Sequence, residues 1–482
     1  MTQAKHGIRI SSRVFAASAL VLFILMLGAG ILTRLIPSGS FQRVEGPLGF
    51  QVVPGTYQAA DKQAYPAWRW LSAPLEVLAG PDGLQAGVII AFICIVGGAF
   101  SILDRARILE EVVQAMARKF SKRRYLMLAL VVAFFMGIGA LLGIFEETIP
   151  LVPVAIALSL SMGWDVYAGL GMSILATGFG FSAAIANPFS IGVAQRLAGL
   201  GLFSGAGFRI LCFALVYALF LSWILSYVRK LDRRKVPSPR DGHPDEGGPA
   251  RVPAPSLEPS PAPTGLSRGA VFFAAATGLL LCLILAISLT RKFADYSMPI
   301  IALAFLATGF GSGLRGGMAF KEAGRAFLGG VAGILPGVVL ILQAMAVKHI
   351  IVTGGVMDSI LNAAATALDG ASGYGAAGLM YLLTLGMNFF IGSATAKAFL
   401  LMPLLAPLAD LSGLSRQIAV QAFAFGDGFS NMLYPTNAVL LIALGVAGVP
   451  WTSWLKKTWI LQAAALALTM ALLMAAVALG YK

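Results

Sequence analysis

Apolar residues run along this chain in stretches that are long enough to cross a lipid bilayer. Examples are residues 14–36, 84–103 and 459–480, and about 18 consecutive apolar residues suffice for a transmembrane helix. The first stretch follows a basic segment, and no small-residue cleavage site comes after it, which indicates a signal anchor rather than a removed signal peptide. The pattern predicts an all-α polytopic membrane protein with about 10–12 spanning segments.

Four of these apolar stretches are broken by glycine, proline and polar residues. The breaks read GIFEETIPLVP (143–153), GFGFSAAIANPFSIG (178–192), NFFIGSATAKAFLLMP (388–403) and GDGFSNMLYPTN (426–437). In hydrocarbon, an unsatisfied backbone polar group is costly, so irregular backbone persists only where it is buried in protein or lines a cavity. We therefore expect the four breaks to surround a site.

The breaks also recur in the same order in two halves of the chain. GFGFS at 178–182 returns as GDGFS at 426–430, and each half has an interrupted hairpin followed by a broken helix. We place the hairpins at 125–163 and 371–412, and the broken helices at 166–200 and 415–448. The flanking charges give the halves opposite orientations, so we predict inverted repeats, a pattern typical of transporters with a site at the bilayer midplane.

The predicted boundaries follow from these halves and from two polar segments. They are a cytoplasmic N-terminus with the first transmembrane helix (1–36), an external loop (37–82), the first repeat (83–228), a cytoplasmic linker (229–268), connecting and scaffold helices (269–326) and the second repeat (327–482). The linker is rich in proline and poor in apolar residues, which predicts disorder. The external loop is expected to form a small β-rich cap.

The charge of the chain fits a membrane protein and not a nucleic-acid-binding one. The formal net charge is +14, yet 23 of the 35 lysines and arginines fall in clusters on the side that we assign to the cytoplasm. This asymmetry orients a membrane protein. The basic character therefore reflects membrane topology, so we expect a lipid bilayer and no nucleic acid as partner.

The breaks contain the candidate chemistry, because half-helix ends and Ser, Thr and Asn side chains can hold carboxylates and cations with little formal charge. Candidate substrate ligands are Glu146, Glu147, Asn187, Ser393, Thr395, Lys397, Asn431, Thr436 and Asn437. Candidate ligands of a coupling ion are Thr148, Ser182, Ser190, Asp427 and Ser430. No cofactor is expected, and no metal beyond a sodium ion; coupling to either sodium or protons is open.

Structural roles compete with these assignments. The hydroxyl groups can bond back to their own helix or join close helices. Ionisable groups at membrane depth are functional by default, but Lys397 could instead form a structural pair with Asp427 or with one of the two glutamates. Asp358 is expected on a solvated amphipathic face.

Lys397 follows Ser393 by four residues and would share its helix face. The resulting hypothesis is that Lys397 binds a substrate carboxylate while Glu147 or Glu146 holds a substrate amine or the coupling cation.

Four of these motifs together resemble a known family. EETIPLVP, NPFSIGVAQ, GSATAKA and GDGFSNMLYPTN resemble the YfcC-type branch of the four-carbon dicarboxylate anaerobic carrier family, within the ion transporter superfamily. The resemblance implies ion-coupled secondary transport across the bacterial inner membrane, a homodimer and elevator-like motion. In sodium–dicarboxylate relatives the hairpin tips read Ser-Asn-Thr; here they read Glu147-Thr148 and Ser393-Ala394-Thr395.

The sequence thus predicts a symporter or exchanger of a small carboxylate-bearing metabolite, either a four-carbon dicarboxylate or an amino acid. The alternatives are a basic amino-acid antiporter of the arginine/ornithine type and, after that, a cation/proton exchanger. An enzyme is not expected. The run FGDGF resembles part of an intramembrane aspartyl protease signature, but Ala424 stands in place of its first glycine and no second motif supplies the partner carboxylate. A phosphate-binding GxxxxGK[ST] loop is also missing from the sequence.

Overall fold

The structure of the protein is a computed structural model. It describes residues 12–46, 49–61, 65–120, 123–234, 266–290, 296–368, 371 and 373–482. The described chain is almost entirely helical, and eight of its helices are long and apolar enough to cross a membrane. The predicted class, an all-α polytopic membrane protein, is confirmed.

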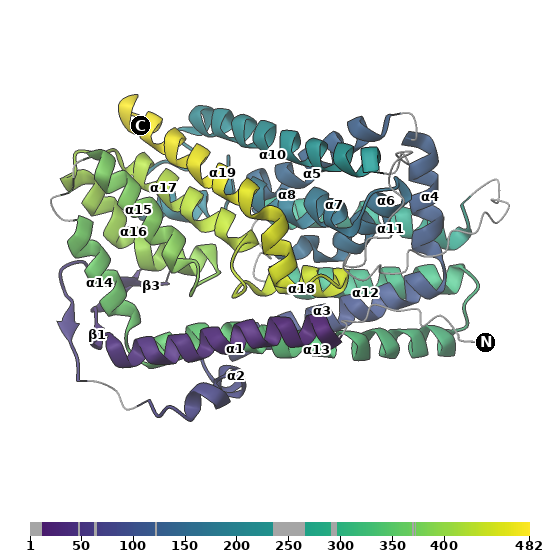
Figure 1. Ribbon diagram of the computed structural model, residues 1–482, viewed down its shortest axis with the longest axis horizontal. Helices are drawn as coiled ribbons and strands as arrows, with labels where there is room; N and C mark the ends of the chain where they lie inside the picture. Colours follow the sequence, from purple (N-terminus) through teal and green to yellow (C-terminus); the bar gives the residue numbers. More distant parts are fainter. Residues whose placement is uncertain are drawn as a thin grey trace, which may run out of the picture.

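Long helices form the two outer sides of the molecule. Helix α1 (Ser12–Leu35) lies along α13 (Phe320–Thr353), and α13 also packs on α3 (Gly83–Arg105). On the opposite side α10 (Ala206–Arg234) contacts α19 (Trp451–Ala478). Figure 1 shows the shorter, interrupted helices between these two sides. The breaks are therefore surrounded by protein. Within a membrane, non-helical backbone has to be buried in this way, because lipid cannot form hydrogen bonds with its polar groups.

The first half contains the predicted hairpin and broken helix. Helix α4 (Ile108–Phe120) precedes the hairpin, which consists of α5 (Arg124–Leu142), the 3-10 turn η2 (Glu146–Leu151) and α6 (Val152–Ser161). The broken helix consists of α7 (Val166–Leu170), a π-helical turn η3 (Gly171–Leu175), α8 (Ala176–Ser182) and, after the break, α9 (Ile191–Leu197). Asp165 caps α7 by accepting a hydrogen bond from Ala168 N at 2.9 Å.

The second half contains the same elements in the same order. Helix α14 (Met357–Leu368) precedes a hairpin of α15 (Gly373–Met387) and α16 (Ala394–Leu411). The broken helix consists of α17 (Arg416–Gly428), the 3-10 turn η5 (Phe429–Met432) and α18 (Ala438–Ala447). Both hairpins end at a glycine in the left-handed region, Gly163 (φ +82°) and Gly413 (φ +70°), where a side chain would be strained. The shared order fits a repeat; its inverted orientation stays a prediction.

Two helices connect the halves, namely α11 (Arg268–Thr290) and α12 (Ser297–Arg315). Helix α10 continues to Arg234, so the linker does not begin at residue 229 as we placed it. Charged residues that follow the apolar run, up to Arg234, continue the same helix. Residues 235–265, most of the predicted linker, lie outside the described residues.

The segment between α1 and α3 packs against the end of α13 and against α14. Strand β1 (Gly39–Ser40) pairs with β4 (Gln58–Ala59), and β2 (Arg43–Gly46) pairs with β3 (Gly49–Val52); both pairs are antiparallel and precede α2 (Arg69–Ala79). Asp358 on α14 is buried, not solvated, because it accepts hydrogen bonds from Phe41 N at 3.0 Å and Arg43 at 2.8 Å. This corrects our expectation of a solvated Asp358.

Candidate functional site

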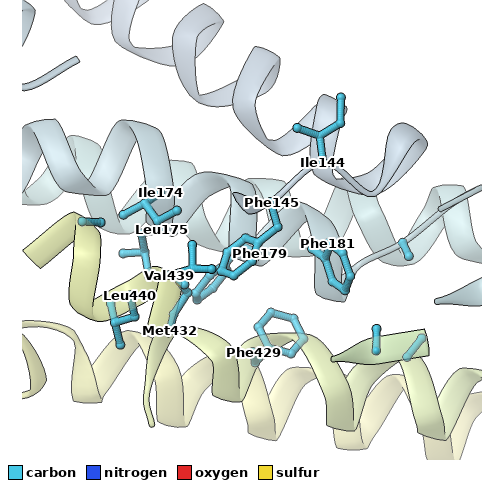
Figure 2. Close-up of a cluster of buried hydrophobic side chains, with 14 of the residues drawn as sticks. Ile144, Phe145, Ile174, Leu175, Phe179, Phe181, Phe429, Met432, Val439 and Leu440 are labelled. Carbon is cyan, nitrogen blue, oxygen red and sulfur yellow. The ribbon is translucent and has the colours of Figure 1, made fainter. Parts of the chain in front are cut away.

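The two broken helices meet at the centre of the molecule. Helix α8 contacts both α17 and η5, and a Cβ atom added to Gly428 would overlap Ser182 of the other half. Phe179 packs edge-on against Phe429 with ring centroids 5.1 Å apart. Figure 2 shows this apolar cluster, in which Phe145, Phe179 and Phe181 from the first half face Phe429 and Met432 from the second. Tightly packed aromatic rings therefore fill this part of the contact between the two halves.

The second break holds a fully buried ion pair. The ammonium of Lys397 donates hydrogen bonds to Asp427 Oδ1 and to Asn388 Oδ1, and both charged side chains are 0% exposed. Lys397 lies in the first turns of α16 and Asp427 in the last turn of α17. A buried charge at membrane depth is tolerated only when it is paired, so each of these residues requires the other.

Amide side chains continue from this pair into the break. Asn388 Nδ2 donates to Ser430 Oγ at 2.7 Å and to Asn431 Oδ1 at 2.9 Å. Asn437 Nδ2 donates to the same Asn431 oxygen at 3.0 Å, while Asn437 Oδ1 caps α18 by accepting from Leu440 N at 3.1 Å. The network therefore joins the end of α15, the end of α17 and the start of α18.

The tip of the second hairpin is the more open part of this half. Ser393 is exposed, and its hydroxyl oxygen caps α16 by accepting from Ala396 N at 3.3 Å. Thr436 bonds to Phe389 O at 2.7 Å, which attaches the broken helix to the hairpin. Thr395 donates to Phe189 O of the first half at 3.1 Å. The two hydroxyls thus have structural partners.

The first break has polar atoms without partners. Asn187 Oδ1 accepts from Phe189 N at 2.8 Å and Ser190 N at 3.2 Å, which turns the chain into α9. Asn187 Nδ2 and Ser190 Oγ are buried and make no hydrogen bond within the described part of the chain. Because unpaired buried donors are uncommon and costly, these two atoms are suited to receive a ligand.

Two carboxyl groups follow the hairpin glycine that contacts Asn187. The Asn187 amide lies against Gly143 at the hairpin tip, where a Cβ atom would overlap it, and Gly143 adopts a left-handed φ of +69°. Glu146 and Glu147 follow in the next turn and are partly buried. Glu147 Oε2 accepts from Phe145 N at 3.3 Å. Donors for a carboxylate at the first broken helix and acceptors for a cation in the first hairpin therefore flank the contact between Asn187 and Gly143.

Two other candidates of the first half make bonds within their own segments. Thr148 donates to Phe145 O at 2.6 Å, and Ser182 donates to Gly178 O at 2.7 Å. These are local bonds of the kind that serine and threonine side chains make to the backbone of their own segment.

The structure changes the expected role of Lys397. Its ammonium does not stand on an open face with Ser393, because Asp427 and Asn388 hold it in the interior. Asn388 was not among the sequence candidates. The available signal was a polar residue at the start of NFFIGS, directly after an apolar helix.

Discontinuous apolar helices that meet around a buried charged and amide network define a polytopic membrane transporter. The chain belongs to the C4-dicarboxylate anaerobic carrier (DcuC) family, whose sequence profile matches residues 15–478. It is therefore a multi-pass transporter of the bacterial inner membrane.

Individual relatives are similar over most of the chain. A protein of Escherichia coli (strain K12) that is provisionally named basic amino acid antiporter YfcC is 30% identical over 399 residues, 80% of this chain and 77% of the relative. An uncharacterised protein of Haemophilus influenzae is 24% identical over 407 residues, 84% of this chain and 77% of that protein. Among solved structures, the Alcanivorax borkumensis YdaH transporter has 20% sequence identity and a TM-score of 0.44, over 96% of this chain and 99% of its own.

Proposed function

We propose that this protein is an ion-coupled secondary transporter, a symporter or exchanger, whose substrate is an amino acid rather than a four-carbon dicarboxylate. The observation that carries the proposal is the first break. There Asn187 Nδ2 and Ser190 Oγ have no hydrogen-bond partner among the described residues, and the Asn187 amide lies against Gly143, three residues before Glu146. Two donors suit a carboxylate, and two carboxyl groups suit an amine.

The second break supports an amino acid for a different reason. A dicarboxylate brings two negative charges. The buried Arg209 beside the first break already donates to the backbone oxygens of Ile185, Ser204 and Phe203, and Lys397 is the cation within the second break. Its charge is already balanced by Asp427. A dianion placed near Glu146 and Glu147 would meet like charges in a low dielectric, which disfavours binding.

Basic amino-acid exchange is the variant of this function that the name of one relative favours. The Escherichia coli protein carries the provisional name of a basic amino acid antiporter. A substrate with a second cationic group would use both glutamates, one for each cationic group. Exchange of one basic amino acid for another would leave the charge of the site unchanged in each half-cycle.

The mechanism that we propose is elevator-like, in a homodimer. The unit that carries the breaks would slide along α3 and α13. A small cavity between these parts is lined by apolar side chains, glycine and proline, including Ile93 of α3, Ile334 of α13 and Ile442 of α18. Where apolar side chains face each other, as they do around this cavity, no hydrogen bond has to be broken when the parts slide.

A thermal-shift screen of the purified protein tests the proposed substrate class. Arginine, lysine, ornithine, neutral amino acids and succinate would be added separately, because a ligand that binds only the folded state raises its stability. We expect a basic amino acid to raise the melting temperature and succinate to leave it unchanged. Glu147→Gln should weaken the response to the basic amino acid, whereas Asn362→Ala on the distant α14 should not. A response to succinate alone would overturn the assignment.

A further inference from the structure

The ammonium of Lys397 occupies a position built like a cation site. Its partners in the described structure are oxygen atoms, Asn388 Oδ1 and Asp427 Oδ1, and all three residues are buried. One carboxylate with neutral carbonyl-type oxygens is the ligand set that hard cations prefer. The same surroundings also fit an ammonium ion, which donates to oxygen acceptors.

Two helix ends give this position a negative potential. Helix α15 ends at Met387, one residue before Asn388, and α17 ends at Gly428, one residue after Asp427. The C-terminal end of a helix carries a partial negative charge and stabilises a cation there. In transporters with broken helices, half-helix C-termini and unwound backbone hold the coupling cation. Lys397 Nζ therefore stands where such a cation belongs.

The neighbouring amides fix the oxygen of Asn388 as the atom that faces the ammonium. Both N–H groups of Asn388 are used, one toward Ser430 and one toward Asn431. Since an amide has two such hydrogens on nitrogen, its oxygen is left for Lys397. Ser430 in turn contacts the backbone oxygens of Gly426 at 3.2 Å and Asp427 at 3.3 Å. The site is thus arranged for one positive charge.

A sodium ion does not fit this arrangement beside the ammonium. We assigned Asp427 and Ser430 to a coupling ion from the sequence, but the carboxylate of Asp427 already neutralises Lys397. A second cation would place two like charges within a few ångströms in a low dielectric, with one carboxylate between them. Sodium at the second break would require that Lys397 first leave.

We propose that Lys397 is a tethered cation that takes the place of a sodium ion at the second break of this transporter. The side chain supplies covalently the charge that a free ion would supply by binding. Sodium is therefore excluded from the second break, and any ion coupling uses another group. The inference concerns the coupling ion of the proposed function and does not depend on the identity of the substrate.

Sodium binding to the purified full-length protein tests the proposal without substrate. Melting temperatures would be compared in sodium chloride and in choline chloride at equal ionic strength and pH 7. We expect no sodium-specific shift for the natural protein. Lys397→Ala opens the position, so sodium at about 100 times its dissociation constant should raise the melting temperature of this variant by about 3 °C.

The matched control is the double variant Lys397→Ala with Asp427→Asn. It has the same space but no carboxylate, and sodium should not stabilise it. A sodium shift in the natural protein that disappears in Asp427→Asn would overturn the proposal, and so would a folded Lys397→Ala that does not respond. If Lys397→Ala does not fold, Lys397→Ser leaves similar space with a hydroxyl ligand and is subject to the same criteria. Because no substrate is present, failure of the substrate assignment would not change these results.

Discussion

Removing one charge of the Lys397–Asp427 pair should destabilise the protein strongly, and removing both should restore most of the loss. Both side chains are 0% exposed, so water cannot solvate the charge that is left. Loss of one partner of a buried pair costs about 3–5 kcal/mol. Replacement of both by neutral groups of similar volume is often close to neutral.

The structure also ranks the two single variants. In Lys397→Met the carboxylate of Asp427 loses its cation, and its Oδ2 atom already lacks a hydrogen-bond partner in the described structure. In Asp427→Asn the ammonium keeps Asn388 and gains a neutral amide oxygen. We therefore expect Lys397→Met near the upper end of about 3–5 kcal/mol and Asp427→Asn near the lower end.

Thermal unfolding in detergent and choline chloride would measure this cycle. An unfolding entropy of about 2.1 cal/mol/K per residue makes 1 kcal/mol equal to about 1 °C for a chain of this length. The exposed pair Arg416–Asp410 provides the control, because its side chains are 42% and 46% exposed. Asp410→Asn should cost about 1 kcal/mol or less. Additive losses in the double variant would refute the reasoning, since they would mean that the two charges do not stabilise each other.

Three further predictions concern packing, the segment between α1 and α3, and the linker. Gly180→Ala should lower the free energy of unfolding by about 1–3 kcal/mol, because its Cβ would overlap the backbone carbonyl of Met136 on α5. Gly137→Ala is the control, because the space around Gly137 is open and no stability should be lost. Equal losses in thermal unfolding would contradict the prediction. A hydrogen bond from Arg69 is the main cause that lowers the pKa of Glu76 from 4.5 to about 2, so this carboxylate stabilises the fold above about pH 4.5 and loses its contribution as the pH falls toward 2. Glu76→Gln should remove that part of the acid sensitivity of unfolding, followed by tryptophan fluorescence. An unchanged acid profile would exclude a contribution of Glu76 to stability. Deletion of residues 240–262 should leave uptake near normal, because a proline-rich connector of low apolar content contributes little to folding. Loss of uptake at normal membrane expression would show that the linker has a role of its own.

The fold was largely predictable from the sequence because its signals are local. Long apolar runs, and the glycine and proline residues that interrupt them, act within one turn or one span, so helices form along the apolar runs and end near the interruptions. The end of α10 differs, because charged residues up to Arg234 continue the helix beyond the apolar run. Composition alone does not locate such an end.

The pairing inside the site was less predictable because it depends on contacts between elements. The spacing of Ser393 and Lys397 gives their common helix face, but the residues opposite that face come from α15 and α17, which the local pattern does not place. Asp358 is a second case. Its amphipathic helix suggests solvent, yet the strand segment around Phe41 covers it. The sequence offered Asp427 and the two glutamates as possible partners of Lys397, whereas the choice of Asp427 and the part of Asn388 required the tertiary structure.

The exchange of labelled arginine in proteoliposomes tests the central claim most directly. The claim is that Asn187 and Ser190 at the first break receive the carboxylate of an amino-acid substrate. A lost hydrogen bond to a charged group is worth about 1.5–3 kcal/mol, so Asn187→Ala should raise the half-saturation concentration by about 10–100-fold. Asn362→Ala should exchange arginine like the natural protein. Saturable exchange of labelled succinate without exchange of arginine, or an Asn187→Ala variant with unchanged half-saturation, would contradict the account.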